Sequence, residues 1–168
     1  MNTIEAGAKA PSFTLTDQDG NKVSLTDFKG KRLALFFYPE DDTPTCTVEA
    51  CNLRDHFSSL TKKGISVVGI SPDDEKKHSK FIEKFTLPFT LLADPKMKVI
   101  NAYGVWGEKN MYGRTYMGIK RTTFLINEDG KIHQVIRKVL SKKHADQILK
   151  AYQGLLLTGL FSGRITAR

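Results

Sequence analysis

Two cysteines in a short polar segment are the residues of this sequence best suited to covalent chemistry. The segment runs from Tyr38 to Cys51 and reads YPEDDTPTCTVEAC; Cys46 and Cys51 are the two cysteines of the 168-residue chain. The thiolate of a cysteine is a strong nucleophile and is the form that reacts with oxidants. Because the two cysteines lie so close together in sequence, the pattern favours a protein that uses its thiols.

The first of these cysteines is expected near the start of a helix. Thr43 is a good N-cap residue and Pro44 suits the first helical position, which puts Cys46 at about the third position. The unpaired backbone N–H groups and the positive end of the helix dipole both favour negative charge there. The position alone therefore makes Cys46 a candidate nucleophile, held towards its thiolate form.

The second cysteine lies five residues further along the same expected helix. That spacing corresponds to about 7.5 Å of rise and about 140° of rotation. A disulfide needs Cα atoms no more than about 7 Å apart and Cβ vectors that converge. An intact helix therefore forbids a bond between Cys46 and Cys51, and pairing them requires the first turns of the helix to unwind.

Three other interpretations of the cysteines compete with this one. Both could be inert buried residues, because Cys46 shares a helix face with Ala50 and Leu53 as a core residue would. A zinc site formed by Cys46, Cys51 and His56 is disfavoured, because spacings of five and five scatter the ligands around a helix. A disulfide exchanger of the thioredoxin type would need a Cys-x-x-Cys motif, which the sequence lacks.

The elements that must position this segment follow from the apolar pattern. The continuous apolar runs Leu33–Tyr38 and Ile65–Ser71 predict central strands, and residues 44–62 between them predict an amphipathic helix. The other expected elements are a hairpin over 13–25, helices over 73–85, 95–103 and 141–152, a strand over 89–92 and a hairpin over 122–139. This order predicts an α/β fold of the thioredoxin-like plan, with an N-terminal β-hairpin and a central mixed sheet covered by helices on both faces.

Composition and charge limit the class of protein. With 40% hydrophobic and 26% charged residues, the chain is expected to form one globular domain over residues 1–154, followed by a tail of unassigned role over 155–168. The net charge of +8 comes from scattered Lys and Arg residues, so we expect no nucleic-acid partner. We expect no membrane partner, because no apolar run approaches the roughly 20 residues of a membrane helix. Residues 1–13 show no secretory signal, so a cytoplasmic location is expected.

The cysteine segment resembles the active-site signature of the peroxiredoxins, which here reads Pro39-x-x-x-Thr43-x-x-Cys46. With Cys51 five residues later, it is similar to the bacterioferritin comigratory protein, or peroxiredoxin Q, branch of that family. The resemblance continues in order along residues 4–153, through the segments 5–15, 89–94, 103–109 and 118–127. One departure is Thr45, at a position where the family usually has glycine.

The resemblance implies a thiol peroxidase of the atypical 2-Cys type that reduces hydrogen peroxide and organic hydroperoxides. Cys46 would be the peroxidatic cysteine, and Cys51 the resolving cysteine that forms an intramolecular disulfide with it. The hydroxyl of Thr43 would contact the peroxide and the reacting sulfur. Arg121, just before the expected strand that begins at residue 122, would stabilise the thiolate.

The resemblance also implies the surroundings and partners of this site. Pro39 would shield the pocket, and Glu49 would pair with Arg121 and hold it in place. The reductant would be thioredoxin, the enzyme would serve antioxidant defence as a monomer, and neither a metal nor an organic cofactor would be needed. Two other classes of function are weighed against this one: a basic nucleic-acid or chaperone-type binding module on the same fold, and a structural domain with unreactive cysteines.

Overall fold

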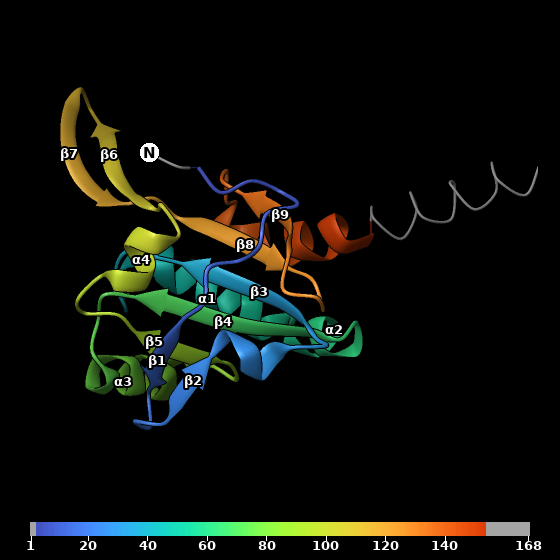
Figure 1. The fold of residues 1–168 in the computed structure, drawn as a ribbon. Helices are drawn as coiled ribbons and strands as arrows, with labels where there is room; N and C mark the ends of the chain where they lie inside the picture. Colours follow the sequence, from blue (N-terminus) through green and yellow to red (C-terminus); the bar gives the residue numbers. More distant parts are fainter. Residues whose placement is uncertain (1–2, 154–168) are drawn as a thin grey trace, which may run out of the picture.

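A seven-stranded sheet forms the centre of the protein in a computed structural model that describes residues 3–153 (Figure 1). The strands lie in the order β2-β1-β5-β4-β3-β8-β9. Their bounds are Thr14–Asp17 for β1, Lys22–Ser24 for β2, Arg32–Phe37 for β3, Ile65–Ser71 for β4, Thr90–Ala93 for β5, Thr122–Ile126 for β8 and Ile132–Ile136 for β9. The three central strands β3, β4 and β5 are parallel, and the outer pairings are antiparallel. The expected mixed sheet and N-terminal hairpin are therefore confirmed.

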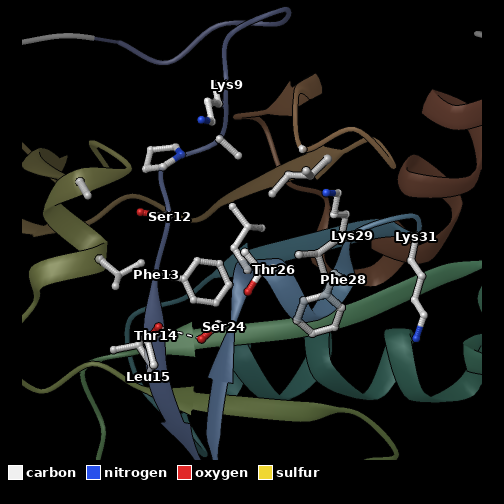
Figure 2. A pocket seen from close by; sticks show the side chains of 18 of the residues that line it. Lys9, Ser12, Phe13, Thr14, Leu15, Ser24, Thr26, Phe28, Lys29 and Lys31 are labelled. Carbon is white, nitrogen blue, oxygen red and sulfur yellow. Dashed lines mark hydrogen bonds between the residues drawn. The ribbon is translucent and has the colours of Figure 1, made fainter.

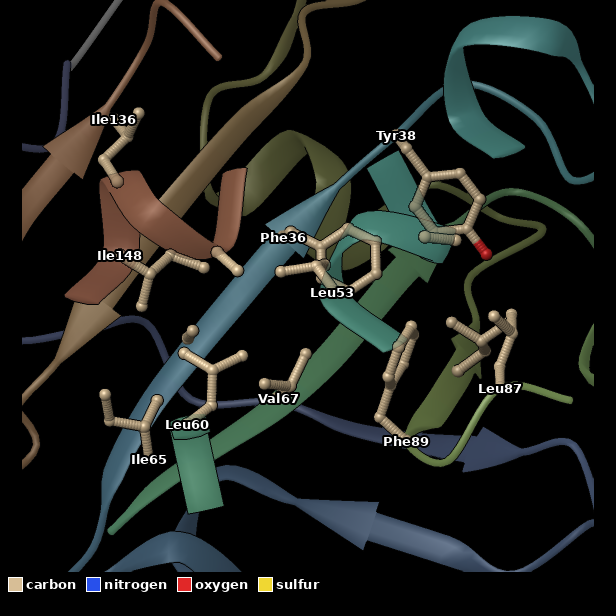
Figure 3. Packing of buried hydrophobic residues seen from close by; sticks show 14 of the residues in the cluster. Phe36, Tyr38, Leu53, Leu60, Ile65, Val67, Leu87, Phe89, Ile136 and Ile148 are labelled. Atoms are coloured by element: carbon tan, nitrogen blue, oxygen red, sulfur yellow. The ribbon is translucent and has the colours of Figure 1, made fainter. Parts of the chain in front are cut away.

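Helices cover both faces of this sheet. Their bounds are Pro44–Asp55 for α1, Phe57–Lys62 for α2, Glu75–Phe85 for α3 and Lys98–Ala102 for α4, with short 3₁₀ helices η1 at Leu25–Phe28 and η2 at Ser141–Lys143; residues 144–153 are also helical. One apolar cluster joins the sheet to α1, α2, α3 and the helix after η2 (Figure 3). A second cluster joins the opposite face to α4 and the N-terminal segment. The expected thioredoxin-like arrangement is confirmed.

The helix expected over residues 44–62 is in fact two helices that break at His56. The backbone of His56 leaves the helical region at φ −112° and ψ 13°, and its ring Nδ1 lies 2.9 Å from the Asn52 carbonyl oxygen. The apolar spacing continues through the break to Leu60, which is buried in the same cluster. Because the apolar spacing continues, the periodicity of the sequence does not predict the break at His56. The consequence is that α1 is a separate helix of about three turns that carries both cysteines.

A second, two-stranded sheet projects from the body of the protein (Figure 1), and the sequence analysis did not assign it. It consists of β6, Trp106–Met111, and β7, Arg114–Ile119. The turn residues Tyr112 and Gly113 both have positive φ, at 52° and 78°, as a tight two-residue hairpin turn requires. The return strand β7 leads directly into Lys120 and Arg121, so this hairpin ends beside the arginine that the resemblance placed near the thiolate.

Nothing in the described residues 3–153 forms a helix both long and apolar enough to cross a membrane. The tail assigned to residues 155–168 lies outside the described residues.

Candidate active site

The sulfur of Cys46 meets the guanidinium of Arg121 at the start of α1. Cys46 is the third residue of that helix, is only 3% exposed and belongs to the apolar cluster beneath it. Arg121 Nη2 donates a hydrogen bond to Cys46 Sγ at 3.3 Å. A cation in direct contact stabilises a thiolate, and because only 17% of the Arg121 side chain is exposed, water screens the attraction less than it would at the surface. The inert-cysteine interpretation explains the burial but not this contact.

The same guanidinium also binds Glu49, as the resemblance implied. Glu49 follows Cys46 by three residues, so both side chains lie on one face of α1. Arg121 Nη1 donates to Glu49 Oε1 at 2.6 Å. Burial works against the charge on Arg121, but the negative charges of Glu49 and Cys46 outweigh it and raise the pKa of Arg121. Arg121 therefore stays protonated, and its planar fork is fixed at both ends.

The other oxygen of Glu49 has no such partner. Glu49 is completely buried, and Oε2 is the buried side-chain oxygen or nitrogen of the described residues that lacks a hydrogen bond. Burial raises the pKa of Glu49 to about 7, against the opposing effect of Arg121. Close to neutral pH, Glu49 is therefore protonated in part of the molecules and ionised in the rest, although it accepts a hydrogen bond from Arg121.

Thr43, Pro39 and Thr45 surround the start of the helix. Thr43 is the N-cap residue as expected, but its hydroxyl donates to the Glu40 carbonyl oxygen at 2.9 Å, so its hydrogen-bond partner is Glu40 and not Cys46. The Thr43 side chain therefore makes no capping hydrogen bond to the first turn of α1, and the backbone N–H groups of that turn stay available to other partners. Pro39 is half-buried at the end of β3. Thr45, the departure from the family's glycine, is exposed and is not part of the buried cluster.

Cys51 lies in the same unbroken helix, half-buried, and both cysteines are free thiols. The expectation that an intact helix keeps them apart is confirmed. The next residue, Asn52, ties α1 to the C-terminal part of the fold: its Nδ2 donates to the Lys142 carbonyl oxygen and its Oδ1 accepts from the Ala145 N–H, both at 2.8 Å. This tie lies just beyond the segment that would have to unwind.

A buried polar network that the sequence analysis missed holds the loop between β3 and α1. Tyr38 Oη donates to Asp41 Oδ1 at 2.5 Å, and His78 Nδ1 lies 2.6 Å from Asp41 Oδ2. The other ring nitrogen of His78 lies 3.0 Å from the Leu92 carbonyl oxygen. Both ring nitrogens of His78 thus lie within hydrogen-bond distance of oxygen atoms, which holds the ring in one orientation. The network fixes the loop that leads to Thr43.

The same network contains the group of side chains best placed for a metal ion within residues 3–153. Ligand atoms of Asp41, Asp73 and His78 lie within 4.8 Å of one another. Asp73 Oδ2 already accepts from the Asp41 N–H at 2.7 Å, so the group is bonded internally. The zinc set weighed in the sequence, two cysteines and His56, is not the one that the fold brings together.

A cavity of about 1120 Å³ lies elsewhere, between the N-terminal segment, η1 and α4 (Figure 2). Phe13 and Phe28 contribute apolar walls, and Lys29 and Lys31 lie at its rim. The residues around Cys46 do not line it. The large cavity is therefore separate from the reactive sulfur, and a substrate of only a few atoms needs no such volume.

Replacing Glu49 with glutamine is expected to change how stability depends on pH. The folded-state pKa of Glu49, about 7, lies above its unfolded value of 4.5, so between those values only the folded protein holds the proton. Wild-type stability should therefore fall as pH rises from 4.5 to 7, by up to about 1.4 kcal/mol per pH unit. The free energy of unfolding of Glu49→Gln minus that of wild type should therefore increase across that range and level off above it.

Urea denaturation of the reduced proteins between pH 5 and 8 measures this difference. Glu83→Gln, at an exposed position of α3, is the matched control and should track the wild type at every pH. A Glu49→Gln difference that stays constant over this range would contradict the account of a carboxyl group neutralised by burial.

Comparisons with known proteins agree with this geometry. Residues 6–135 match the model of the AhpC/TSA family. Peroxiredoxin Bcp of Escherichia coli is 50% identical over 149 residues, which cover 89% of this chain and 96% of that protein. Peroxiredoxin Bcp of Bacillus subtilis is 44% identical over 153 residues, covering 91% and 98%.

Solved structures show the same relationship. A mutant of peroxiredoxin Q from Xanthomonas campestris superposes with a TM-score of 0.82 at 34% identity, covering 89% of this chain and 98% of that one. The bacterioferritin comigratory protein of Xanthomonas campestris, studied for its alkyl peroxide reduction activity, gives a TM-score of 0.81 at 33% identity and covers 89% and 98%. The chain thus belongs to the AhpC/TSA family and, within it, is a peroxiredoxin of the Bcp, or Q, type, a thiol peroxidase.

Proposed function

We propose that this peroxiredoxin reduces hydrogen peroxide and organic hydroperoxides through a sulfenic acid at Cys46 and a disulfide between Cys46 and Cys51, which thioredoxin reduces. The observation that carries the proposal is the hydrogen bond from Arg121 Nη2 to Cys46 Sγ at the start of a helix. It joins a nucleophile, a fixed cation and a set of backbone donors in one place. Reduction of alkyl peroxides by the related Xanthomonas protein supports the organic substrates.

In the first step, the Cys46 thiolate attacks the terminal oxygen of the hydroperoxide. The sulfur–oxygen bond forms as the oxygen–oxygen bond breaks, and the departing alkoxide or hydroxide takes a proton and leaves as alcohol or water. In this proposal, Arg121 and the N–H of Cys46 bind the peroxide oxygens as charge moves between them. The Thr43 hydroxyl donates to Glu40, so its oxygen lone pairs remain for the O–H of the peroxide.

In the second step, Cys51 attacks the Cys46 sulfenic acid, a disulfide forms and water leaves. Because α1 separates the two sulfurs, its N-terminal turns must unwind first. Asn52 holds the helix to Lys142 and Ala145 immediately after Cys51. We infer that unwinding runs from Pro44 to Cys51 and stops at this tie, so that the rest of the fold stays intact.

In the third step, the dithiol of thioredoxin reduces the disulfide, which the unwound segment exposes to a partner. Consumption of NADPH in the presence of thioredoxin, thioredoxin reductase and peroxide tests this step. The proposal expects turnover that depends on thioredoxin, with both hydrogen peroxide and a bulky organic hydroperoxide. Turnover that is indifferent to thioredoxin would contradict it. We further propose that the enzyme works as a cytoplasmic monomer built from one domain over residues 1–154.

Cys51→Ser is expected to retain one fast peroxide-consuming event and to lose multiple turnover with thioredoxin. The reason is that Cys46 still reacts, but its sulfenic acid has no neighbouring thiol to resolve it. Mixing the reduced variant with excess peroxide and following peroxide consumption measures a burst of one equivalent per chain, and a sulfenic-acid trap should label Cys46. Absence of a burst would mean that Cys51 does something other than resolve.

A further inference from the structure

A histidine that had no assigned role in the sequence lies next to the Glu49 carboxyl group, on the side of Oε2, the oxygen that does not contact Arg121. His144 is completely buried at the start of the last helix, and its Nε2 lies 3.6 Å from Glu49 Oε2, the oxygen without a hydrogen bond. Thr123 Oγ1, on β8, lies 2.6 Å from the same nitrogen. The groups therefore follow one another from the Cys46 sulfur through the half-buried Arg121 to Glu49 and His144, which are both buried.

The hydrogen bonds of Gln147 decide which nitrogen of His144 carries a proton. Gln147 Nε2 donates to the Lys138 carbonyl oxygen at 3.0 Å, and its Oε1 accepts from the Leu140 N–H at 2.9 Å, which fixes the orientation of the amide. His144 Nδ1 lies 2.9 Å from that same Oε1, so Nδ1 must be the donor. In the neutral ring Nε2 is then an acceptor, whose lone pair takes the hydrogen bond of the Thr123 hydroxyl, and the same nitrogen lies 3.6 Å from Glu49 Oε2 without a hydrogen bond to it.

We propose that His144 is a positioning residue of the peroxidatic site, which favours the protonated form of the Glu49 carboxyl group and so leaves more of the charge of Arg121 for the Cys46 sulfur. Nε2 is the negative end of the imidazole dipole, and its position 3.6 Å from Oε2 disfavours a carboxylate there and favours the uncharged carboxylic acid. With Glu49 neutral, the guanidinium and the thiolate balance each other. With Glu49 ionised, a second negative charge competes with the sulfur for the same cation.

The electrostatics of each neighbour agree with this assignment. Burial lowers the pKa of His144 to about 4 against the opposing effect of the Gln147 hydrogen bond, and the positive charge of Arg121 adds to the lowering, so the ring is neutral at pH 7. Burial raises the pKa of Glu49 to about 7. The other groups that face His144, Thr123 on β8 and Gln147 on its own helix, are uncharged. A neutral ring facing a protonated carboxyl group is thus the arrangement that the surroundings favour.

His144→Gln tests the proposal, because the glutamine amide group can place a donor near the position of Nε2. That donor would stabilise the ionised form of Glu49 at lower pH. Alkylation of Cys46 by iodoacetamide, measured in the Cys51→Ser background, should then slow about tenfold at pH 6 and little at pH 8, where Glu49 is ionised in both proteins. The same His144→Gln change made in a Glu49→Gln protein should have no such pH-dependent effect.

A merely structural role predicts a different pattern, and the controls separate the two. A loss of the same size at pH 6 and pH 8, or one that persists in the Glu49→Gln background, would overturn the proposal. His133→Gln, a histidine that packs against Tyr152 away from the site, should leave the alkylation rate unchanged at both pH values.

A measurement on the wild type covers the case in which the His144 variant does not fold. Nitrogen-15 NMR of the imidazole should report a neutral His144 with its proton on Nδ1 from pH 8 down to pH 5. A proton on Nε2, or a charged ring at pH 7, would overturn the proposal. The inference rests on the proposed function of Cys46, but neither alkylation nor the NMR signal requires peroxide or thioredoxin, so a failure of that function would be seen separately.

Discussion

Replacing Cys46 with serine is expected to abolish peroxide consumption, both the single-turnover burst and the steady state with thioredoxin. A serine hydroxyl in this position is not ionised at neutral pH, so the hydrogen bond from Arg121 would have no thiolate to stabilise. The loss should therefore be complete rather than partial. Peroxide remaining after mixing with stoichiometric reduced protein is the direct measurement.

Two properties of the Cys46→Ser variant serve as controls: that it is folded, and that its remaining thiol can be titrated. Cys46 is buried in an apolar cluster, and serine is slightly smaller, so the variant should fold and keep one titratable thiol at Cys51. Peroxide turnover retained by folded Cys46→Ser would refute the assignment of Cys46 as the nucleophile.

Replacing Arg121 with methionine is expected to slow the first step by about 100- to 1000-fold, the range seen when one fixed donor to a developing charge is removed. Methionine fills much of the same space but donates no hydrogen bond to Cys46 and leaves Glu49 without a cation. The second-order rate of the peroxide burst, measured by rapid mixing, gives the size of the effect.

Two further arginine variants make this result specific. Arg114→Met, at an exposed position of strand β7, should react at the wild-type rate. Arg121→Lys should fall between wild type and Arg121→Met, because one ammonium group cannot reproduce a planar fork that reaches both partners. If Arg121→Met reacted as fast as Arg114→Met, Arg121 would have no role in the first step and would be only a charged residue at the end of a strand.

The sequence predicts the central sheet and the start of α1 because both depend on local signals. Thr43 and Pro44 mark a helix start, and continuous apolar runs mark buried strands, whatever the rest of the chain does. The hairpin β6–β7 escaped this reasoning because it projects from the body. Its strands carry exposed side chains such as Met111, without the alternation that a half-buried strand shows. The Tyr112-Gly113 turn was its one local signal.

The candidate site divides in the same way. Cys46 and Cys51 could be found from spacing, and the resemblance supplied Arg121 and Glu49 before the fold brought them together. His144 could not be found, because nothing near it in sequence distinguishes it. Its importance comes from tertiary packing that places it against a carboxyl group 95 positions away. Thr43 was predicted correctly as the N-cap residue of α1, but the hydrogen bond from its hydroxyl to Glu40 depends on the conformation of the loop.

The most direct test of the central claim is the mass of the reduced protein after addition of one equivalent of hydrogen peroxide. The account predicts a loss of two hydrogens in each chain and, after digestion, a single peptide in which Cys46 and Cys51 are linked to each other. A chain that keeps both thiols, or that forms its disulfide with a second copy, would contradict it.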